Sequence, residues 1–444
     1  MKALRLLSQT KLYWGLLIIV LIGALTSPYT SSGSNIFLSY ENLTDVLRQV
    51  SITGLVATGM TMVILLGGID LSVGSVMGFA TVICAMLLTM RGWNAASVMG
   101  VPVTTIVIGA AVALIARFIF SGLARSHDVG AGQRRNIALS PSRSLWIPSL
   151  LGLVAAIAVA WWTASQVPTR FGVLGVLVVS SCLALALGAI NGLLIVTGRL
   201  QPFIATLAMM VSALGIARLT AGQDNAVVPV YTGTNATEAF EFLRSMLWGV
   251  LPVPSVFFLA AIILFGAILR FTTFGRYAYA IGGNVEAAKL SGIKVAQVQL
   301  TAYLLSGLLA GIAGVLFVAQ YRQGKPDAGT GLELDAIAAV VIGGTSLMGG
   351  RGGLAGTFVG VLIFGLLSDI LQLQNIDSNV QLLMKGLIIV CTVLVQEQNL
   401  GQLIARWRFS RTREGGADPK TAESARLPSA AKAQFAREDL DEAS

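Results

Sequence analysis

The sequence is poor in charge. Of its 444 residues only 11% are Asp, Glu, Lys or Arg, whereas 55% are hydrophobic. A soluble domain contains about 25% charged residues, and a soluble globule of this size would need far more charge to cover its surface. The shortage excludes an ordinary soluble enzyme and indicates a protein that crosses a membrane several times.

The sequence also contains only one histidine, His127, and three cysteines. A single histidine leaves almost no room for a histidine-based metal site or a catalytic triad within this chain. The cysteines Cys84, Cys182 and Cys391 lie in apolar runs without the spacing of metal ligands, so we interpret them as small packing residues. We therefore expect no metal and no cofactor.

What is abundant is long apolar sequence. Twelve runs approach or reach the length of about 20 residues that crosses a bilayer as a helix. The first run follows basic residues as a signal peptide would, but no small-residue cleavage site follows cleanly, and we interpret it as a retained helix. The sequence thus predicts an all-α, polytopic membrane protein. The runs are 12–28, 47–66, 75–90, 102–122, 146–163, 173–196, 203–219, 248–269, 297–319, 334–348, 354–372 and 381–397.

The basic residues are distributed unevenly between the segments that connect these runs. With the N-terminus placed in the cytoplasm, the cytoplasmic segments hold 21 of the 30 Lys and Arg residues and the outer segments hold 5. This is the asymmetry that the positive-inside rule predicts, with both termini in the cytoplasm. The net charge of +9 is therefore a signal of topology, and we expect no nucleic-acid partner. The cytoplasmic segments are 1–11, 67–74, 123–145, 197–202, 270–296, 349–353 and 398–444.

Two glycine-rich segments interrupt the apolar pattern, at 65–75 and 341–353. Both follow an apolar helix, begin with an aliphatic residue and Gly-Gly, and lead into another helix, so they resemble corresponding positions of two structural repeats. Paired interruptions of this kind often mark the path of a transported molecule. The candidate residues for that path are Gly68, Asp70, Ser72, Gly343, Gly344, Thr345 and Ser346.

Three charged residues within or beside the apolar runs allow more than one interpretation. Asp70 either lines the path or, with Ser72, caps the helix that follows, and the two roles are compatible. Asp369 and Lys385 lie near the outer ends of their runs. They could pair with each other, but we favour side chains that reach separately to the membrane surface.

The cytoplasmic segment 270–296 carries the signal of a short helix of its own. Asn284 is a good N-cap, Glu286 falls in the first turn, Lys289 in the last turn, and Gly292 ends the helix. A helix of about two turns is marginal in water by itself. We therefore expect it to dock on a partner protein, with a plain surface loop as the alternative.

The same segment carries a resemblance to a known family. Together with three other stretches it resembles the ribose/xylose-type monosaccharide permeases of ATP-binding cassette importers, in the branched-chain amino acid/ribose permease superfamily. The matching motifs fall within residues 40–397. They are Gly275–Tyr277, Ala280–Asn284 and Glu286–Ile293 in the loop, and Gly68–Ser75, Gly198–Leu207, Glu333–Ala339 and Gly343–Leu347 elsewhere.

The resemblance implies the permease subunit of a bacterial inner-membrane importer. Its implied partners are an ATP-binding subunit with Walker motifs, a periplasmic sugar-binding protein and a second copy of the permease, all acting at a lipid membrane. This chain has no Gly-x-x-x-x-Gly-Lys-Ser/Thr loop, so it would not itself be the ATPase. The residues that the resemblance assigns to the coupling of ATP hydrolysis are Gly282, Gly283, Asn284, Glu286, Ala287, Ala288 and Gly292.

The chain is longer than the family pattern of about ten spans. We interpret residues 102–163 as an inserted helical pair, which preserves the orientation of everything after it. Residues 1–397 would then form the permease domain, with 270–296 as its coupling loop. The remaining segment, 398–444, begins with a basic run and continues with mixed charge, and we expect a disordered cytoplasmic tail.

Two other functional classes are less compatible with the sequence. A secondary sugar transporter with twelve spans would commonly have a long loop between its sixth and seventh spans, whereas residues 197–202 leave six residues there. It would also need its ion or substrate site within one chain that has few interior charges. An intramembrane enzyme would need a set of catalytic groups that the sequence lacks.

Overall fold

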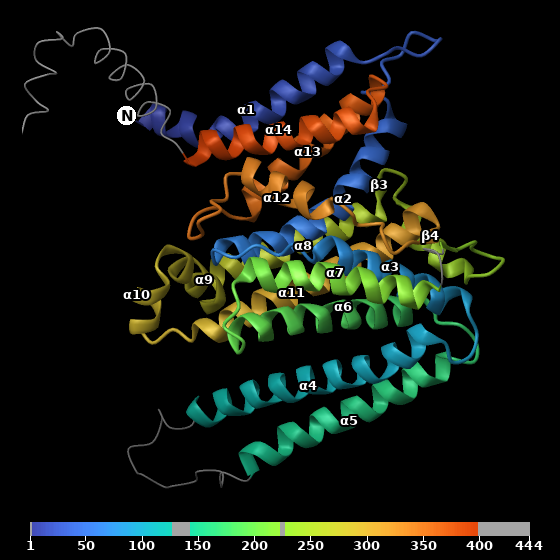
Figure 1. Ribbon diagram of the computed structural model, residues 1–444, viewed down its shortest axis with the longest axis vertical. Coiled ribbons are helices and arrows are strands. Elements are labelled where there is room, and N and C mark those ends of the chain that lie inside the picture. The colour runs from blue at the N-terminus through green and yellow to red at the C-terminus, as the bar shows by residue number, and fades with distance from the viewer. Residues whose placement is uncertain (1, 127–142, 223–226, 398–444) are drawn as a thin grey trace, which may run out of the picture. The chain divides into compact units, whose positions relative to one another are not determined.

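The computed structural model describes residues 2–126, 143–222 and 227–397, which are predominantly helical (Figure 1). His127 and the predicted tail 398–444 lie outside the described residues. The α-helices are α1 Lys2–Thr26, α2 Tyr40–Leu65, α3 Val73–Thr89, α4 Ala95–Ser126, α5 Arg143–Gln166, α6 Val173–Val196, α7 Pro202–Ala221, α8 Val253–Phe271, α9 Thr273–Gly283, α10 Val285–Leu290, α11 Val295–Tyr321, α12 Leu332–Ile342, α13 Leu354–Leu373 and α14 Ser378–Glu397.

A helix occupies each of the twelve predicted apolar runs, which confirms an all-α membrane protein. Over the described ranges, eight helices are both long and apolar enough to cross a bilayer: α2, α4, α5, α6, α7, α8, α11 and α13. The count of twelve crossings and the cytoplasmic location of both termini stay predictions.

The run 334–348 requires a correction, because its helix is much shorter than expected. Helix α12 has 11 residues, about 16 Å at 1.5 Å per residue, whereas the hydrocarbon core is about 30 Å thick. Gly343 follows as the C-cap, and Gly344 adopts a φ of +85° that favours glycine. Helix α12 alone therefore does not span a membrane.

Residues 1–388 pack as one compact unit, and residues 389–444 form a second unit of which only the end of α14 is described. Helices α2 and α11 lie at the centre of the first unit. In the most apolar stretch of each, 78% and 72% of the residues are buried. Helices α3, α6, α8, α12 and α13 pack around this central pair, so segments far apart in the sequence meet at the two glycine-rich breaks.

Close approach between helices depends on small residues at the points of contact. Gly307 of α11 faces α6 so closely that a Cβ there would lie 3.0 Å from the Cα of Gly188. Gly314 of the same helix faces α3, where a Cβ would lie 2.8 Å from the Met77 carbonyl oxygen. These contacts bring the backbones of α3, α6 and α11 together around the first break.

Helices α4 and α5 form a pair that packs mainly on itself (Figure 1). Gly109 and Gly152 make the close contacts, with Ala156 and Ala113 respectively. Only 22% of the α4 stretch and 17% of the α5 stretch are buried, and the pair touches the rest of the unit mainly through α6. Their surface is therefore available to lipid or to another protein.

The end of the unit opposite α9 and α10 carries the short strands (Figure 1). Strand β1 Val228–Pro229 pairs antiparallel with β4 Gln323–Gly324, and β2 Met246–Leu247 pairs with β3 Leu251–Pro252. Between them lies the 3-10 helix η2 Glu238–Arg244. Strands β1, β2 and β4 and helix η2 belong to segments that the charge distribution places outside the cytoplasm, and β3 lies at the start of the predicted apolar run 248–269.

Candidate translocation and coupling site

The first break surrounds Asp70, which is 1% exposed. The N–H and hydroxyl of Ser72 donate to Asp70 Oδ1 at 3.1 and 2.6 Å. The hydroxyl of Ser306, on α11, donates to Asp70 Oδ2 at 2.8 Å. Asn191 of α6 donates to Ser72 Oγ at 2.8 Å. A buried polar cluster thus joins the break to α6 and α11.

The capping interpretation of Asp70 and Ser72 needs correction. Ser72 is the N-cap residue of α3, but its side chain makes no capping hydrogen bond. Asp70 accepts the N–H of Ser72 and not an N–H of the helix itself, so its carboxylate holds the turn before α3. The carboxylate instead serves long-range contacts across the break.

Three members of this region were missed by sequence reasoning: Asn191, Ser306 and Tyr303. Their only sequence signal is a polar group within a long apolar helix. The Oδ1 of Asn191 and the hydroxyl of Tyr303 are buried and have no hydrogen-bond partner in the described part of the chain. The Tyr303 hydroxyl lies over Gly68, where a Cβ would approach it to 2.6 Å. A side chain at position 68 would therefore displace Tyr303.

The second break is a compact loop between α12 and α13. The N–H of Thr345 donates to the Val340 carbonyl, and the N–H of Ser346 donates to the Arg351 carbonyl at 3.0 Å. Thr345 is fully buried, and its hydroxyl accepts the N–H of Gly353 at 3.4 Å. The loop is therefore held by its own hydrogen bonds.

The two breaks meet through their backbones. The N–H of Gly350 donates to the Leu65 carbonyl at 3.0 Å. A Cβ on Gly349 would lie 2.8 Å from the amide nitrogen of Gly67. The structure thus brings together the two segments that sequence reasoning paired, and their contact runs through glycine backbone.

Helix α9 packs against the same place, and the sequence did not predict this helix. A Cβ on Gly282 would collide with the Leu65 carbonyl oxygen and the Gly350 amide nitrogen. The Tyr279 hydroxyl donates to the Gly352 carbonyl at 2.9 Å. We call the contact among Gly282, Leu65, Gly67, Gly349 and Gly350 the glycine junction. It joins α9 to both breaks.

Helix α10 has the local structure that the sequence predicts. Asn284 is its N-cap and accepts the N–H of Ala287 at 2.9 Å, and Lys289 pairs with Glu286 at 2.7 Å. Gly292 follows with a φ of +79°. The side chain of Glu286 is 77% exposed, and Leu290 is 91% exposed. An apolar tip beside charged residues makes α10 a suitable docking element.

The residues that the resemblance assigns to coupling differ in their exposure, and so in what they can contact. Ala287 and Gly292 are exposed, whereas Ala288 is only 4% exposed. Ala288 therefore packs α10 onto its own chain. Leu290, which sequence reasoning did not single out, presents the largest apolar surface of this helix.

The charged residues Asp369 and Lys385 neither pair with each other nor extend freely. Asp369 accepts a hydrogen bond from Asn42 at 2.9 Å. Lys385 forms an ion pair with Asp335 of α12 at 2.9 Å, with both side chains less than a quarter exposed. Long-range packing of α12 supplies this partner, and the spacing of charges along the sequence does not reveal it.

The site offers hydrogen-bonding groups and backbone contacts more than reactive groups. Within 2–126, 143–222 and 227–397, no three His, Cys, Asp or Glu residues gather as metal ligands would. Cys84 and Cys182 are buried packing residues, as predicted. The arrangement suits a conformational change in which movement of α9 and α10 shifts the two breaks.

Comparison with known proteins gives a consistent family. The sequence profile described as "Branched-chain amino acid transport system / permease component" matches residues 42–126 and 149–393. The matched residues include α4 and most of α5, and they leave out the intervening residues 127–148. A search of the solved structures found no significant match.

Several curated proteins are similar to nearly the whole chain. The ribose import permease protein RbsC of Escherichia coli strain K12 is 33% identical over 88% of this chain and 94% of its own length. The ribose import permease protein RbsC of Bacillus subtilis strain 168 is 34% identical over 87% and 92%. The xylose transport system permease protein XylH of Escherichia coli strain K12 is 30% identical over 82% and 86%.

Proposed function

The chain belongs to the family of branched-chain amino acid transport system permease components, and from that premise we propose that it is the membrane permease of an ATP-driven importer of monosaccharides. The observation that carries this proposal is similarity to ribose and xylose permeases over more than four fifths of the chain. The relatives are permeases of importers and not secondary transporters, so the twelve-span secondary transporter is not favoured. The chain itself supplies a path through the inner membrane.

We propose that an ATP-binding subunit with Walker motifs docks on α10. Support comes from the exposed Leu290 at its tip, 91% accessible, and from the adjacent Glu286–Lys289 pair. A protruding apolar residue flanked by charges suits a groove on a partner, where the apolar group is buried and the charges set the orientation.

The glycine junction gives this docking a mechanical consequence. Helix α9 precedes α10 with only Asn284 between them, and its Gly282 contacts both breaks without any side chain between the backbones. Closure of the ATPase would move α10 and α9 together, and the breaks would shift with them. Nucleotide drives such a change only through its different affinity for the two states.

The breaks would change the path through the cluster around Asp70, which links the first break to α6 and α11. Two buried groups without a partner among the described residues are available to form new hydrogen bonds when the helices rearrange: the Tyr303 hydroxyl and Asn191 Oδ1. The path residues proposed from the sequence belong to the two breaks that α9 contacts, so we expect a movement of α9 to displace them directly.

The opposite end of the unit would receive the sugar-binding protein. The turn between β2 and β3 exposes Trp248, 88% accessible, and Tyr40 anchors that turn through the Gly249 carbonyl. A second permease copy would complete the path, as in a homodimer. Both partners are inferred from the family.

Uptake by the reconstituted importer tests whether the protein transports a monosaccharide, and which one. The permease, its ATP-binding subunit and its sugar-binding protein are placed in vesicles, and uptake of labelled ribose, xylose, arabinose, glucose and leucine is compared. We expect uptake of at least one pentose that an excess of the same unlabelled sugar abolishes. Uptake of branched-chain amino acids but of no sugar would contradict the proposal.

A further inference from the structure

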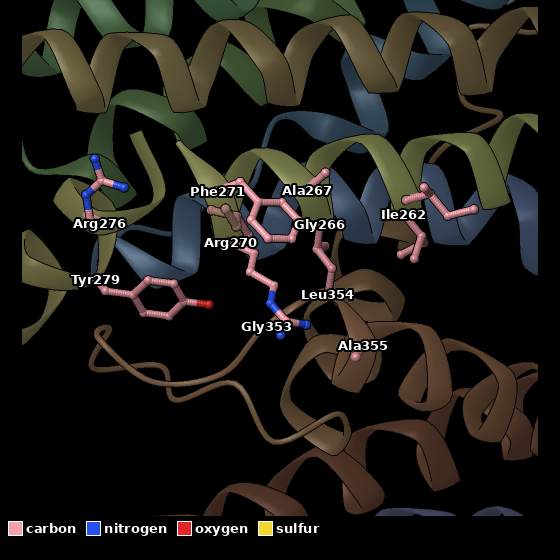
Figure 2. Close-up of a pocket in the computed structure, with 12 residues that line it drawn as sticks. Ile262, Gly266, Ala267, Arg270, Phe271, Arg276, Tyr279, Gly353, Leu354 and Ala355 are labelled. Carbon is pink, nitrogen blue, oxygen red and sulfur yellow. The ribbon is translucent and has the colours of Figure 1, made fainter. Parts of the chain in front are cut away.

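A cavity of about 710 Å³ lies between the end of α8, helix α9 and the start of α13 (Figure 2). Its lining includes Arg270, Arg276 and Tyr279 on one side and Gly353 and Leu354 on the other. The transport mechanism proposed above assigns no ligand to this cavity. Its position at the α9 end places it where we expect the cytoplasmic membrane surface.

The charged groups of this cavity are positive and unpaired. Neither Arg270 nor Arg276 forms an ion pair with any described residue. Figure 2 shows the Arg270 guanidinium directed toward Gly353 and Leu354. Helix α13 begins there with no side-chain cap and no acidic residue in its first turn. A helix N-terminus is itself positive, so the guanidinium and the helix start face each other without a negative group between them.

The walls of the cavity are apolar and open to the outside of the unit. Ile263 is 70% exposed and Phe271 is 73% exposed, and both line the cavity with Ile262. The guanidinium carbon of Arg270 lies 5.6 Å from the centre of the Phe271 ring. The neighbouring Leu264 of α8 is exposed as well. A ligand held by Arg270 would thus have an apolar surface for its hydrocarbon part.

We propose that this cavity binds an anionic phospholipid. The phosphate lies between the Arg270 guanidinium and the start of α13, and an acyl chain follows Ile262, Ile263 and Phe271. A phospholipid alone among the simple anions uses both the charges and the apolar wall. Basic pockets between helices on the cytoplasmic side bind such headgroups.

The lipid has a consequence for coupling because of its position. Arg276 and Tyr279 belong to α9, and the Tyr279 hydroxyl already bonds to Gly352 beside the cavity. A phosphate between Arg270 and the start of α13 joins α8 to α13 next to the glycine junction. The bound lipid therefore holds α8 and α13 in fixed positions beside α9 while α9 moves.

The test measures lipid retained by the importer complex. The permease with its ATP-binding subunit is placed in nanodiscs of phosphatidylglycerol and phosphatidylcholine in equal parts, and native mass spectrometry counts the lipids that stay bound after release. We expect the wild-type complex to retain phosphatidylglycerol preferentially. Arg270→Gln should lower its occupancy about fivefold, the change that corresponds to roughly 1 kcal/mol for one basic residue at a membrane surface.

The controls separate charge from fold and lipid from free phosphate. Arg199→Gln removes the same charge from an exposed residue of the α6–α7 connection and should leave retention unchanged, and Arg270→Lys should keep most of it. Excess inorganic phosphate should not displace the lipid. Equal retention of both lipids, an unaffected Arg270→Gln complex, or full displacement by phosphate would overturn the proposal. Efficient disulfide formation between two Ile263→Cys permeases would also overturn it, because the cavity would then face a second copy.

Discussion

Asp70 is buried among neutral hydrogen-bond donors, so the stability of this cluster depends on those donors as much as on the carboxylate. Ser72 and Ser306 both direct hydroxyls at it, and Asn191 holds Ser72 in place. If the carboxylate is removed, these buried groups lose their acceptor, and each unsatisfied group costs about 1–3 kcal/mol. The cluster is therefore expected to contribute to stability as well as to the path.

This argument predicts the effect of two substitutions at Asp70. Asp70→Ala should lower the free energy of unfolding by about 2–6 kcal/mol, since two buried hydroxyls lose their acceptor, and Asp70→Asn should cost less because the amide oxygen still accepts one hydroxyl. Thermal unfolding of the purified permease in detergent measures both. Asp45→Asn, at a 67% exposed carboxylate, is the matched control and should change little. Equal losses for Asp70→Ala and the control would count against the cluster.

Glu241 provides a dependence on pH at the opposite end of the unit. Burial raises the pKa of its carboxyl, but hydrogen bonds from Thr232 and Arg322, with the charges of Arg322 and Arg244, outweigh this and lower the pKa overall. A lowered pKa stabilises the fold above the unfolded value of about 4.3. That contribution disappears as pH falls through the folded value.

The expected result is a stability difference that depends on pH. Wild-type permease should melt at a higher temperature than Glu241→Gln at about pH 7, and the difference should shrink as the pH falls below the unfolded pKa of about 4.3. Melting curves at a series of pH values measure this. A difference that stays constant down to pH 3 would show that Glu241 acts through packing alone.

At the scale of single residues, sequence reasoning found those whose role is indicated by their immediate sequence neighbours. Asp70 and Ser72 are polar groups in a glycine-rich break, and Asn284 and Glu286 match a helix start. It missed Tyr303, Asn191 and Ser306, because a polar residue inside an apolar helix does not reveal what it faces. The Lys385–Asp335 pair was missed for the same reason, since it depends on where α12 packs.

At the scale of elements, the proposed coupling depends on helix α9, which connects α10 to the two breaks. Its buried residues Gly275, Ala278 and Ile281 recur every three residues, a pattern too short to stand out from the surrounding loop. Helix α10 was predictable because its caps are local. The length of α12 was not, because the apolar run continues past Gly343 although the backbone turns there.

Adjacent glycines at the end of α9 offer a matched test. A methyl group at Gly282 would collide with the Leu65 carbonyl and the Gly350 amide, whereas at Gly283 it would meet no atom of the described residues within 4 Å. We expect Gly282→Ala to lower sugar-stimulated ATP hydrolysis by about tenfold, as a loss of roughly 1.4 kcal/mol in coupling would. Gly283→Ala should remain close to wild type.

The readout separates coupling from folding. Gel filtration and basal ATP hydrolysis of the reconstituted complex check that the Gly282→Ala complex assembles. If Gly282→Ala keeps full stimulation, or if Gly283→Ala loses as much, the glycine junction does not transmit movement from α10 to the breaks.

At the scale of the whole molecule, the distribution of basic residues and the arrangement of elements agree. The breaks at 65–75 and 341–353 meet α9 at one end of residues 1–388, and β1, η2 and β4 lie at the other (Figure 1). The charge distribution assigned these two groups of segments to opposite sides of the membrane. The inserted pair 102–163 and the disordered tail stay predictions from sequence.

Labelling of single cysteines tests this orientation. Ser291→Cys in the α10 turn should react with a membrane-impermeant maleimide only when the cytoplasmic side is accessible, and Thr234→Cys near β1 only from outside. Cys84 and Cys182 are buried and should not react, and labelling of the parent protein measures the background from all three native cysteines. Labelling of both positions from one side would contradict the predicted topology.

The central claim is that ATP drives sugar through this permease. The most direct measurement is uptake of labelled pentose into vesicles that hold the permease, its ATP-binding subunit and its sugar-binding protein, with ATP inside or absent and with ion gradients dissipated or intact. The account predicts that uptake requires ATP and survives the loss of ion gradients. Uptake that proceeds without ATP and stops when the gradients collapse would contradict it.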